Sequence, residues 1–132
     1  MAEYRGLRRF EIALPLNMRL LASFRRPLIV DVQTRNVSLE GLSIELYGGG
    51  ESSRLIPHLV LDRQAVALEI AVPRKGEGIR AIGRVMWYDS GSRRRAEDFR
   101  AGIFLEEMEA EDRKVWAEFV LDTERLWSII RS

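Results

Sequence analysis

The stretch that decides the fold is LIVDVQTRNVSLEGLSIEL, which spans residues 28–46. Its first half places Leu28, Val30 and Val32 at alternate positions, and this period of two is typical of a strand with one buried face. The segment Ser38–Gly41 then predicts a tight reversal. Apolar residues alternate again beyond the reversal, so the whole stretch predicts an antiparallel hairpin.

Alternating apolar residues recur elsewhere in the chain. Four further strands are predicted at residues 10–20, 66–72, 79–88 and 99–105. Pro15 cannot donate a hydrogen bond to a neighbouring strand, so we expect an edge or a bulge there. Gly83, which is predicted to share a strand face with Val85 and Trp87, would permit the sharp bend of a closed sheet. Six short strands of this kind predict a mainly β fold, a six-stranded antiparallel β-barrel.

The final part of the chain has a different period. From residue 115 onward, apolar residues lie three and four positions apart, and acidic residues at 109–112 favour the start of a helix. We predict one C-terminal α-helix at about residues 110–130, whose apolar stripe covers an open end or a flank of the barrel. We assign Trp87, Trp116 and Trp127 to packing on the strand and helix faces.

The chain has 132 residues, of which 46% are apolar, and this suits one compact core and not two. Residues 1–9 are mostly polar and charged, so we interpret them as a flexible arm that precedes a single domain at residues 10–132. The sequence has no apolar run of about 20 residues, and its first ten residues, MAEYRGLRRF, lack the apolar stretch expected of a signal peptide. We therefore expect a cytoplasmic domain without membrane insertion.

The residue types leave few options for catalysis. Cysteine is absent, which excludes disulfides and thiolate chemistry, and His58 is the only histidine. No serine or acid stands at a recognisable triad spacing from His58. The glycines at 48–50 are not followed by the Gly-Lys-Ser/Thr of a phosphate-binding loop. Residues 76–78 join two predicted strands, whereas such a loop runs from a strand into a helix. We therefore expect no enzyme, no metal site and no catalytic cofactor.

Basic and acidic residues nearly balance, with 21 against 20 and a net charge of +1. This balance argues against a protein that holds the backbone of a nucleic-acid polymer. Nineteen of the basic residues are arginine, whose planar fork suits bidentate bonds to anions and to guanine edges.

Two short motifs stand out when they are taken together. Arg5 and Arg9 form an Arg-x-x-x-Arg motif in the arm, and Asn36, Ser38 and Gly41 form an Asn-x-Ser-x-x-Gly motif at the predicted reversal. Alone, the arginines would be a solvated basic tail, and the second motif would be an ordinary turn stabilised by its side chains. Their occurrence together, with 26 residues between them, favours a ligand site.

This combination resembles the PilZ domain, the bacterial receptor module for cyclic di-GMP. The resemblance covers nearly the whole chain, because a Gly-Arg-Val-x-Trp strand at residues 83–87, a Gly-Ile-Phe strand at 102–104 and a terminal helix follow the two motifs. It implies a PilZ-like barrel with a C-terminal helix and cyclic di-GMP as the ligand.

The resemblance also implies roles for the motif residues. Arg5 and Arg9 match the arginines that bond guanine edges and phosphates, and both groups suit a guanidinium fork. Asn36 and Ser38 match the turn positions that bond a guanine edge and nearby ligand groups. Gly41 lets the backbone turn tightly and approach closely, since it has no Cβ.

Two neighbours of these residues receive supporting roles. Arg8 lies at a position that the family leaves variable, and we expect it to contribute only electrostatically. Tyr4 precedes the first motif arginine, a position that influences whether one ligand molecule or an intercalated pair occupies the site. Both stoichiometries stay open, as do a monomer and a dimer.

The resulting hypothesis is a receptor that binds cyclic di-GMP, orders its arm on binding and so signals to an unidentified downstream protein. The alternative is a protein-interaction adaptor of the same fold that acts on motility, pilus or secretion machinery without nucleotide. Titration with cyclic di-GMP separates the two.

Overall fold

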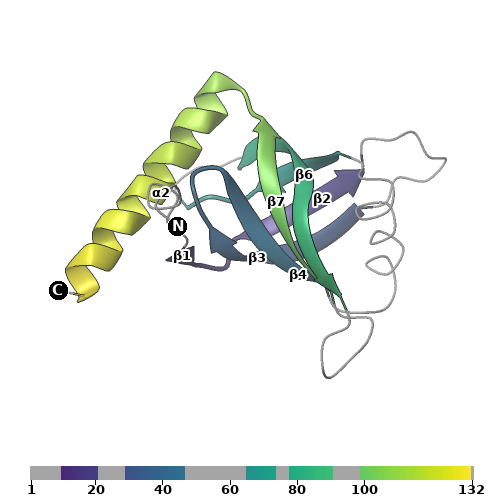
Figure 1. The fold of residues 1–132 in the computed structure, drawn as a ribbon. Coiled ribbons are helices and arrows are strands. Elements are labelled where there is room, and N and C mark those ends of the chain that lie inside the picture. Colours follow the sequence, from purple (N-terminus) through teal and green to yellow (C-terminus); the bar gives the residue numbers. More distant parts are fainter. Residues whose placement is uncertain (1–9, 21–28, 47–64, 74–77, 91–98, 132) are drawn as a thin grey trace.

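The computed structural model describes residues 10–20, 29–46, 65–73, 78–90 and 99–131 (Figure 1). The arm, with Tyr4, Arg5, Arg8 and Arg9, lies outside these described residues, and so does His58. The elements in chain order are β1 (Phe10–Glu11), β2 (Pro15–Leu20), β3 (Ile29–Val37), β4 (Gly41–Leu46), β5 (Val66–Ile70), β6 (Ile79–Ser90), β7 (Phe99–Glu107) and α2 (Ala110–Arg131).

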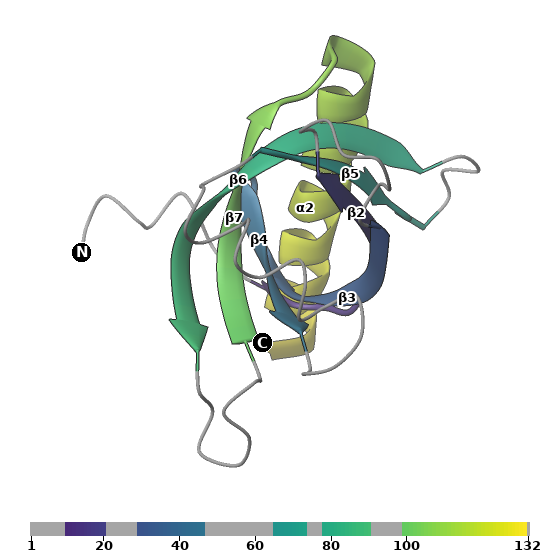
Figure 2. The ribbon, with the colours of Figure 1, turned by 90° about the vertical axis from the view of Figure 1, so that its right-hand side faces the viewer.

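Six strands form a closed antiparallel barrel. Hydrogen-bonded neighbours follow the order β3, β2, β5, β6, β7 and β4, and β4 pairs back with β3 to close the sheet. The two-residue strand β1 adds a short pairing to β3 on the same edge as β2, because the opposite edge of β3 pairs with β4. Figure 2 looks into the barrel, with α2 behind its far opening. The predicted mainly β fold, a six-stranded barrel with a C-terminal helix, is confirmed.

The first predicted strand, residues 10–20, is split in two. Phe10 pairs with Val37, but Pro15 pairs with Gln33, so the register shifts by one residue between β1 and β2. Thr34, which is 3% exposed, bridges the break. Its hydroxyl accepts a hydrogen bond from the backbone nitrogen of Leu14 at 2.9 Å and donates one to the carbonyl of Ile12 at 2.7 Å. The irregularity expected at Pro15 therefore lies at the residues just before it.

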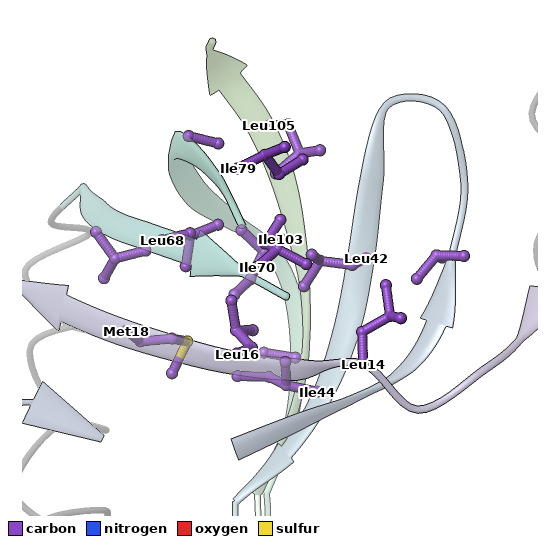
Figure 3. Close-up of a cluster of buried hydrophobic side chains, with 14 of the residues drawn as sticks. Leu14, Leu16, Met18, Leu42, Ile44, Leu68, Ile70, Ile79, Ile103 and Leu105 are labelled. Atoms are coloured by element: carbon purple, nitrogen blue, oxygen red, sulfur yellow. The ribbon is translucent and has the colours of Figure 1, made fainter. Parts of the chain in front are cut away.

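The core is built from the inward faces of all six barrel strands (Figure 3). Alternate residues along each strand are buried, as the period of two requires. The fully buried aliphatic side chains include Met18, Ile44, Leu68, Ile70, Ile79 and Ile103. Each buried side chain of this kind stabilises the fold by about 1.5–3 kcal/mol relative to the exposed state.

Helix α2 covers one end of the barrel, as its apolar stripe predicts (Figure 2). Trp116 and Val120 belong to the buried core, and Val115 and Phe119 pack against it. Glu111 and the neighbouring acid lie in the first turn, where the helix dipole favours negative charge. Within the described part of the chain, no helix has the length and the apolar character that crossing a membrane requires.

One prediction about the barrel is wrong. Trp87 does not share the buried face of Val85, because Met86 is an extra residue in β6. Val85 pairs with Ile103, whereas Trp87 pairs with Gly102. Side chains beyond Met86 therefore point to the opposite face of the sheet from the one that simple alternation predicts. Trp87 consequently lies on the outside of the barrel and is 39% exposed.

Candidate ligand-binding site

The hairpin between β3 and β4 brings three of the predicted ligand residues together. Asn36 is the penultimate residue of β3, Gly41 is the first residue of β4, and Ser38 lies in the connection. The carbonyl of Gly41 accepts a hydrogen bond from the Ser38 backbone nitrogen at 2.8 Å and another from the Ser38 hydroxyl at 3.3 Å. The predicted reversal is thus present, and it is closed by two residues of the motif.

Gly41 has a packing reason to be glycine. It pairs with Phe104 of β7, and a Cβ built at this position would collide with the backbone carbonyl oxygen of Ile103. Because backbone cannot move aside as a flexible side chain can, the close approach of the hairpin to β7 by itself requires glycine.

The turn is also held from outside the hairpin. The backbone nitrogen of Leu105 in β7 donates to the carbonyl of Glu40 at 2.8 Å. The indole nitrogen of Trp116 in α2 donates to the carbonyls of Ser38 and Leu39, at 3.1 and 3.2 Å. The carbonyls of three consecutive turn residues therefore point into the protein, where β7 and α2 fix them.

A bulge turns Asn36 toward the outside of the barrel. Thr34 pairs with Ile44 and Asn36 with Ser43, so Arg35 is an extra residue in β3. Thr34 and Ile44 are both buried, and without the extra residue Asn36 would face inward with them. The bulge thus converts a core position into one that a ligand can reach.

Ser43 orients the side chain of Asn36, a role that was not predicted from the sequence. The Ser43 hydroxyl accepts hydrogen bonds from the backbone nitrogen and from the side-chain Nδ2 of Asn36, both at 3.2 Å. With Nδ2 engaged there, the side-chain oxygen of Asn36 is left to accept from a ligand. A polar residue between Leu42 and Ile44, opposite Asn36 across the hairpin, was the available signal.

These residues belong to a row that crosses the outer face of five strands. The register places Glu11 of β1 beside Asn36, Ser43 beside Gly102 of β7, and Gly102 beside Trp87 of β6. A Cβ on Gly102 would collide with the indole of Trp87, so the indole lies directly over this glycine. Adjacent strands are about 4.8 Å apart, and the row from Asn36 to Trp87 therefore spans about 14 Å. Within this span, Asn36 offers an amide on one side and Trp87 an exposed aromatic ring on the other.

A second row, of charged residues, runs beside the first. Glu45 of β4 lies between two arginines, 3.0 Å from Arg35 and 3.9 Å from Arg100, and Arg100 also lies 3.3 Å from Asp89. Such half-exposed pairs contribute little to stability. Their effect is to hold two guanidinium groups at the edge of the row that contains Asn36 and Trp87.

The arm joins the barrel at this hairpin. Phe10, the first described residue, pairs with Val37, which precedes Ser38. A shallow depression beside β1 is lined by residues that include Glu11, Thr34 and Arg35. A larger hollow in the described part of the chain lies between β2, β5, β6 and the start of α2, and it includes none of the predicted ligand residues. The described residues hold no group of three or more side chains suited to a metal ion.

Solved structures share this architecture. The PilZ domain of YcgR from Escherichia coli, solved with cyclic di-GMP, is similar with a TM-score of 0.60 at 12% identity, over 92% of this chain and 92% of that one. The chain has the PilZ fold. The inhibitor of motility MotI/DgrA from Bacillus subtilis has the same fold, with a TM-score of 0.65 at 14% identity, over 91% of this chain and 50% of its own.

A third PilZ-like structure is PlzA of Borreliella burgdorferi in complex with cyclic di-GMP. Its TM-score is 0.60 at 12% identity, over 93% of this chain and 53% of its own. This PilZ-like chain thus spans about half the length of the Bacillus and Borreliella proteins that it matches. No protein-family model matches the sequence, and no curated protein sequence is similar to it.

Proposed function

We propose that this PilZ-like domain is a receptor for cyclic di-GMP that acts by binding and not by catalysis. The observation that carries the proposal is the β3–β4 hairpin, in which Asn36, Ser38 and Gly41 come together on the outer face with the Asn36 side chain oriented by Ser43. Two structures of the same fold, the YcgR domain and PlzA, were solved with cyclic di-GMP, which supports the choice of ligand.

The row of residues from Asn36 to Trp87 on the outer face of the barrel has side chains that suit a guanine nucleotide. Guanine presents O6 and N7 as acceptors and its N2 amino group as a donor. The side-chain oxygen of Asn36 can accept from that amino group, and the arm arginines can donate to the acceptor edge. The exposed face of Trp87 provides a surface on which a base can stack, an interaction worth about 1–3 kcal/mol.

The covalent attachment of the arm supports a role for its arginines. Arg9 is bonded to Phe10, so their Cα atoms are about 3.8 Å apart, and Arg5 is at most about 14 Å further along the chain. Both arginines can therefore reach a ligand at Ser38. We propose that the arm, residues 1–9, closes over cyclic di-GMP and that its ordering signals to a downstream protein in the bacterial cytoplasm.

Calorimetric titration of the whole chain with cyclic di-GMP tests the receptor. We expect saturable binding, weakened about 10- to 150-fold in Asn36→Ala because a polar contact worth about 1.5–3 kcal/mol is lost. We expect binding to be abolished in the double variant Arg5→Ala with Arg9→Ala. The control is Asn17→Ala, which removes a comparable cross-strand hydrogen bond to Asp31 away from the site.

Hydrogen exchange tests the switch separately. Exchange at residues 3–9 should slow when cyclic di-GMP is added, and the double arginine variant should lose this effect without a change in melting temperature. An arm that is protected before ligand is added, or that stays unprotected at saturation, refutes arm ordering even if the titration shows binding. A flat wild-type titration refutes the receptor and favours the adaptor.

A further inference from the structure

Trp116 links the C-terminal helix directly to the hairpin that carries the proposed ligand residues. Its indole nitrogen lies 3.1 Å from the carbonyl oxygen of Ser38 and 3.2 Å from that of Leu39, which are 78 and 77 residues away in the sequence. The side chain is 1% exposed. A buried indole N–H requires an acceptor, and here both acceptors belong to the turn.

The packing of α2 fixes where this indole can be. Trp116 and Val120 lie one helical turn apart and are both part of the barrel core. The ring of Trp116 also contacts Phe119 in a tilted arrangement, with centroids 6.0 Å apart. The indole therefore cannot follow an independent movement of the turn, and a displacement of α2 changes the position of the donor.

The Trp116 indole holds the turn at Ser38, one of the proposed ligand residues. Ser38 uses its nitrogen and its hydroxyl on Gly41 and its carbonyl on Trp116. The orientation of the Ser38 hydroxyl is thus set between the hairpin and the helix. Leu105 of β7 holds only the carbonyl of Glu40, two residues beyond Ser38.

We propose that Trp116 is a positioning residue for the nucleotide site and that it couples ligand occupancy to the docking of α2. The inference rests on the proposed binding of cyclic di-GMP at the hairpin. Because coupling between two sites is reciprocal, a docked helix increases the affinity for ligand, and bound ligand stabilises the docked helix to the same degree. The helix then becomes a second route, besides the arm, by which occupancy reaches a partner.

The variant Trp116→Phe tests the inference, since it keeps an aromatic ring in the core and removes the N–H donor. We expect the dissociation constant for cyclic di-GMP, measured by calorimetry, to rise about 2- to 12-fold, the effect of one net hydrogen bond. The matched control is Thr123→Val, which removes a hydroxyl that donates to the Phe119 carbonyl within the same helix and leaves Trp116 and Val120 in place. Its affinity should equal that of the wild type.

Two measurements report coupling that a purely structural role would not produce. The indole N–H resonance of Trp116, assigned by its loss in Trp116→Phe, should shift when cyclic di-GMP is added. Amide exchange at residues 113–123 should slow with ligand in the wild type and not in Trp116→Phe at a saturating ligand concentration. The exchange of the wild type with and without ligand decides the matter even if the variant does not fold.

The outcomes separate this inference from the proposed function. A wild-type protein that gives no heat with cyclic di-GMP overturns both. A wild-type protein that binds, with an unshifted indole resonance and unchanged exchange in α2, overturns only the coupling. Equal affinities of the wild type and Trp116→Phe would also overturn it.

Discussion

Replacing Ser43 with alanine removes the hydroxyl that both nitrogen atoms of Asn36 reach, each at 3.2 Å. The neighbouring core residues Leu42 and Ile44 keep their side chains. A buried donor that loses its acceptor costs about 1–3 kcal/mol. Asn36 is only half-buried, so water replaces part of the lost interaction, and we expect the free energy of unfolding to fall by about 1 kcal/mol.

The effect of Ser43→Ala on ligand binding follows from the freedom that Asn36 gains. Immobilising a side chain on binding costs about 0.5–1.5 kcal/mol, so the dissociation constant for cyclic di-GMP should rise about 2- to 12-fold. Urea unfolding gives the stability, and calorimetry gives the affinity. In the control Asn17→Ala, a comparable change of stability should leave the affinity unaltered. If Ser43→Ala binds as tightly as the wild type while Asn36→Ala is impaired, Ser43 does not orient the ligand residue.

Three further substitutions have distinct expected results. Trp87→Ala should weaken binding about 5- to 150-fold through lost stacking. Its melting temperature should fall only slightly, because the indole lies on the outer surface; a wild-type affinity in calorimetry would remove Trp87 from the site. Gly41→Ala should unfold or strongly destabilise the domain in thermal melts, since its Cβ meets the backbone of Ile103, and a wild-type melting temperature would contradict that packing. Trp116→Ala should lower the free energy of unfolding by about 3–5 kcal/mol in urea, and an unchanged midpoint would mean that α2 packs through another face.

The sequence was sufficient for the barrel strands, the helix and their order along the chain, except that the first predicted strand is split into β1 and β2. Each barrel strand alternates apolar and polar residues because one face is buried, and α2 repeats at three and four residues because one stripe is buried. The reversal at Ser38 was predictable for a local reason, since its serine and glycine bond each other within the turn. Patterns of this kind depend on neighbours along the chain.

The features that were missed depend on residues in other strands. Arg35 and Met86 are extra residues, and each moves the side chains that follow it to the opposite face of its strand. The alternation of apolar and polar residues in the sequence does not show where such a residue is inserted. The first bulge exposes Asn36, and the second moves Trp87 to the outer face. Ser43 was overlooked because its role exists only once the hairpin register places it opposite Asn36.

Strand β1 and the first half of helix α2 both meet the same hairpin, and this has a mechanical consequence. On one side β1 pairs with the last two residues of β3, so the chain enters the barrel next to Ser38. On the other side α2 donates the Trp116 indole to the carbonyls of Ser38 and Leu39. A group bound at this hairpin therefore acts within a few ångströms of both segments that lead out of the barrel. Because the core between them is closely packed and resists small displacements, a ligand at the hairpin can alter how either segment docks while the barrel itself stays unchanged.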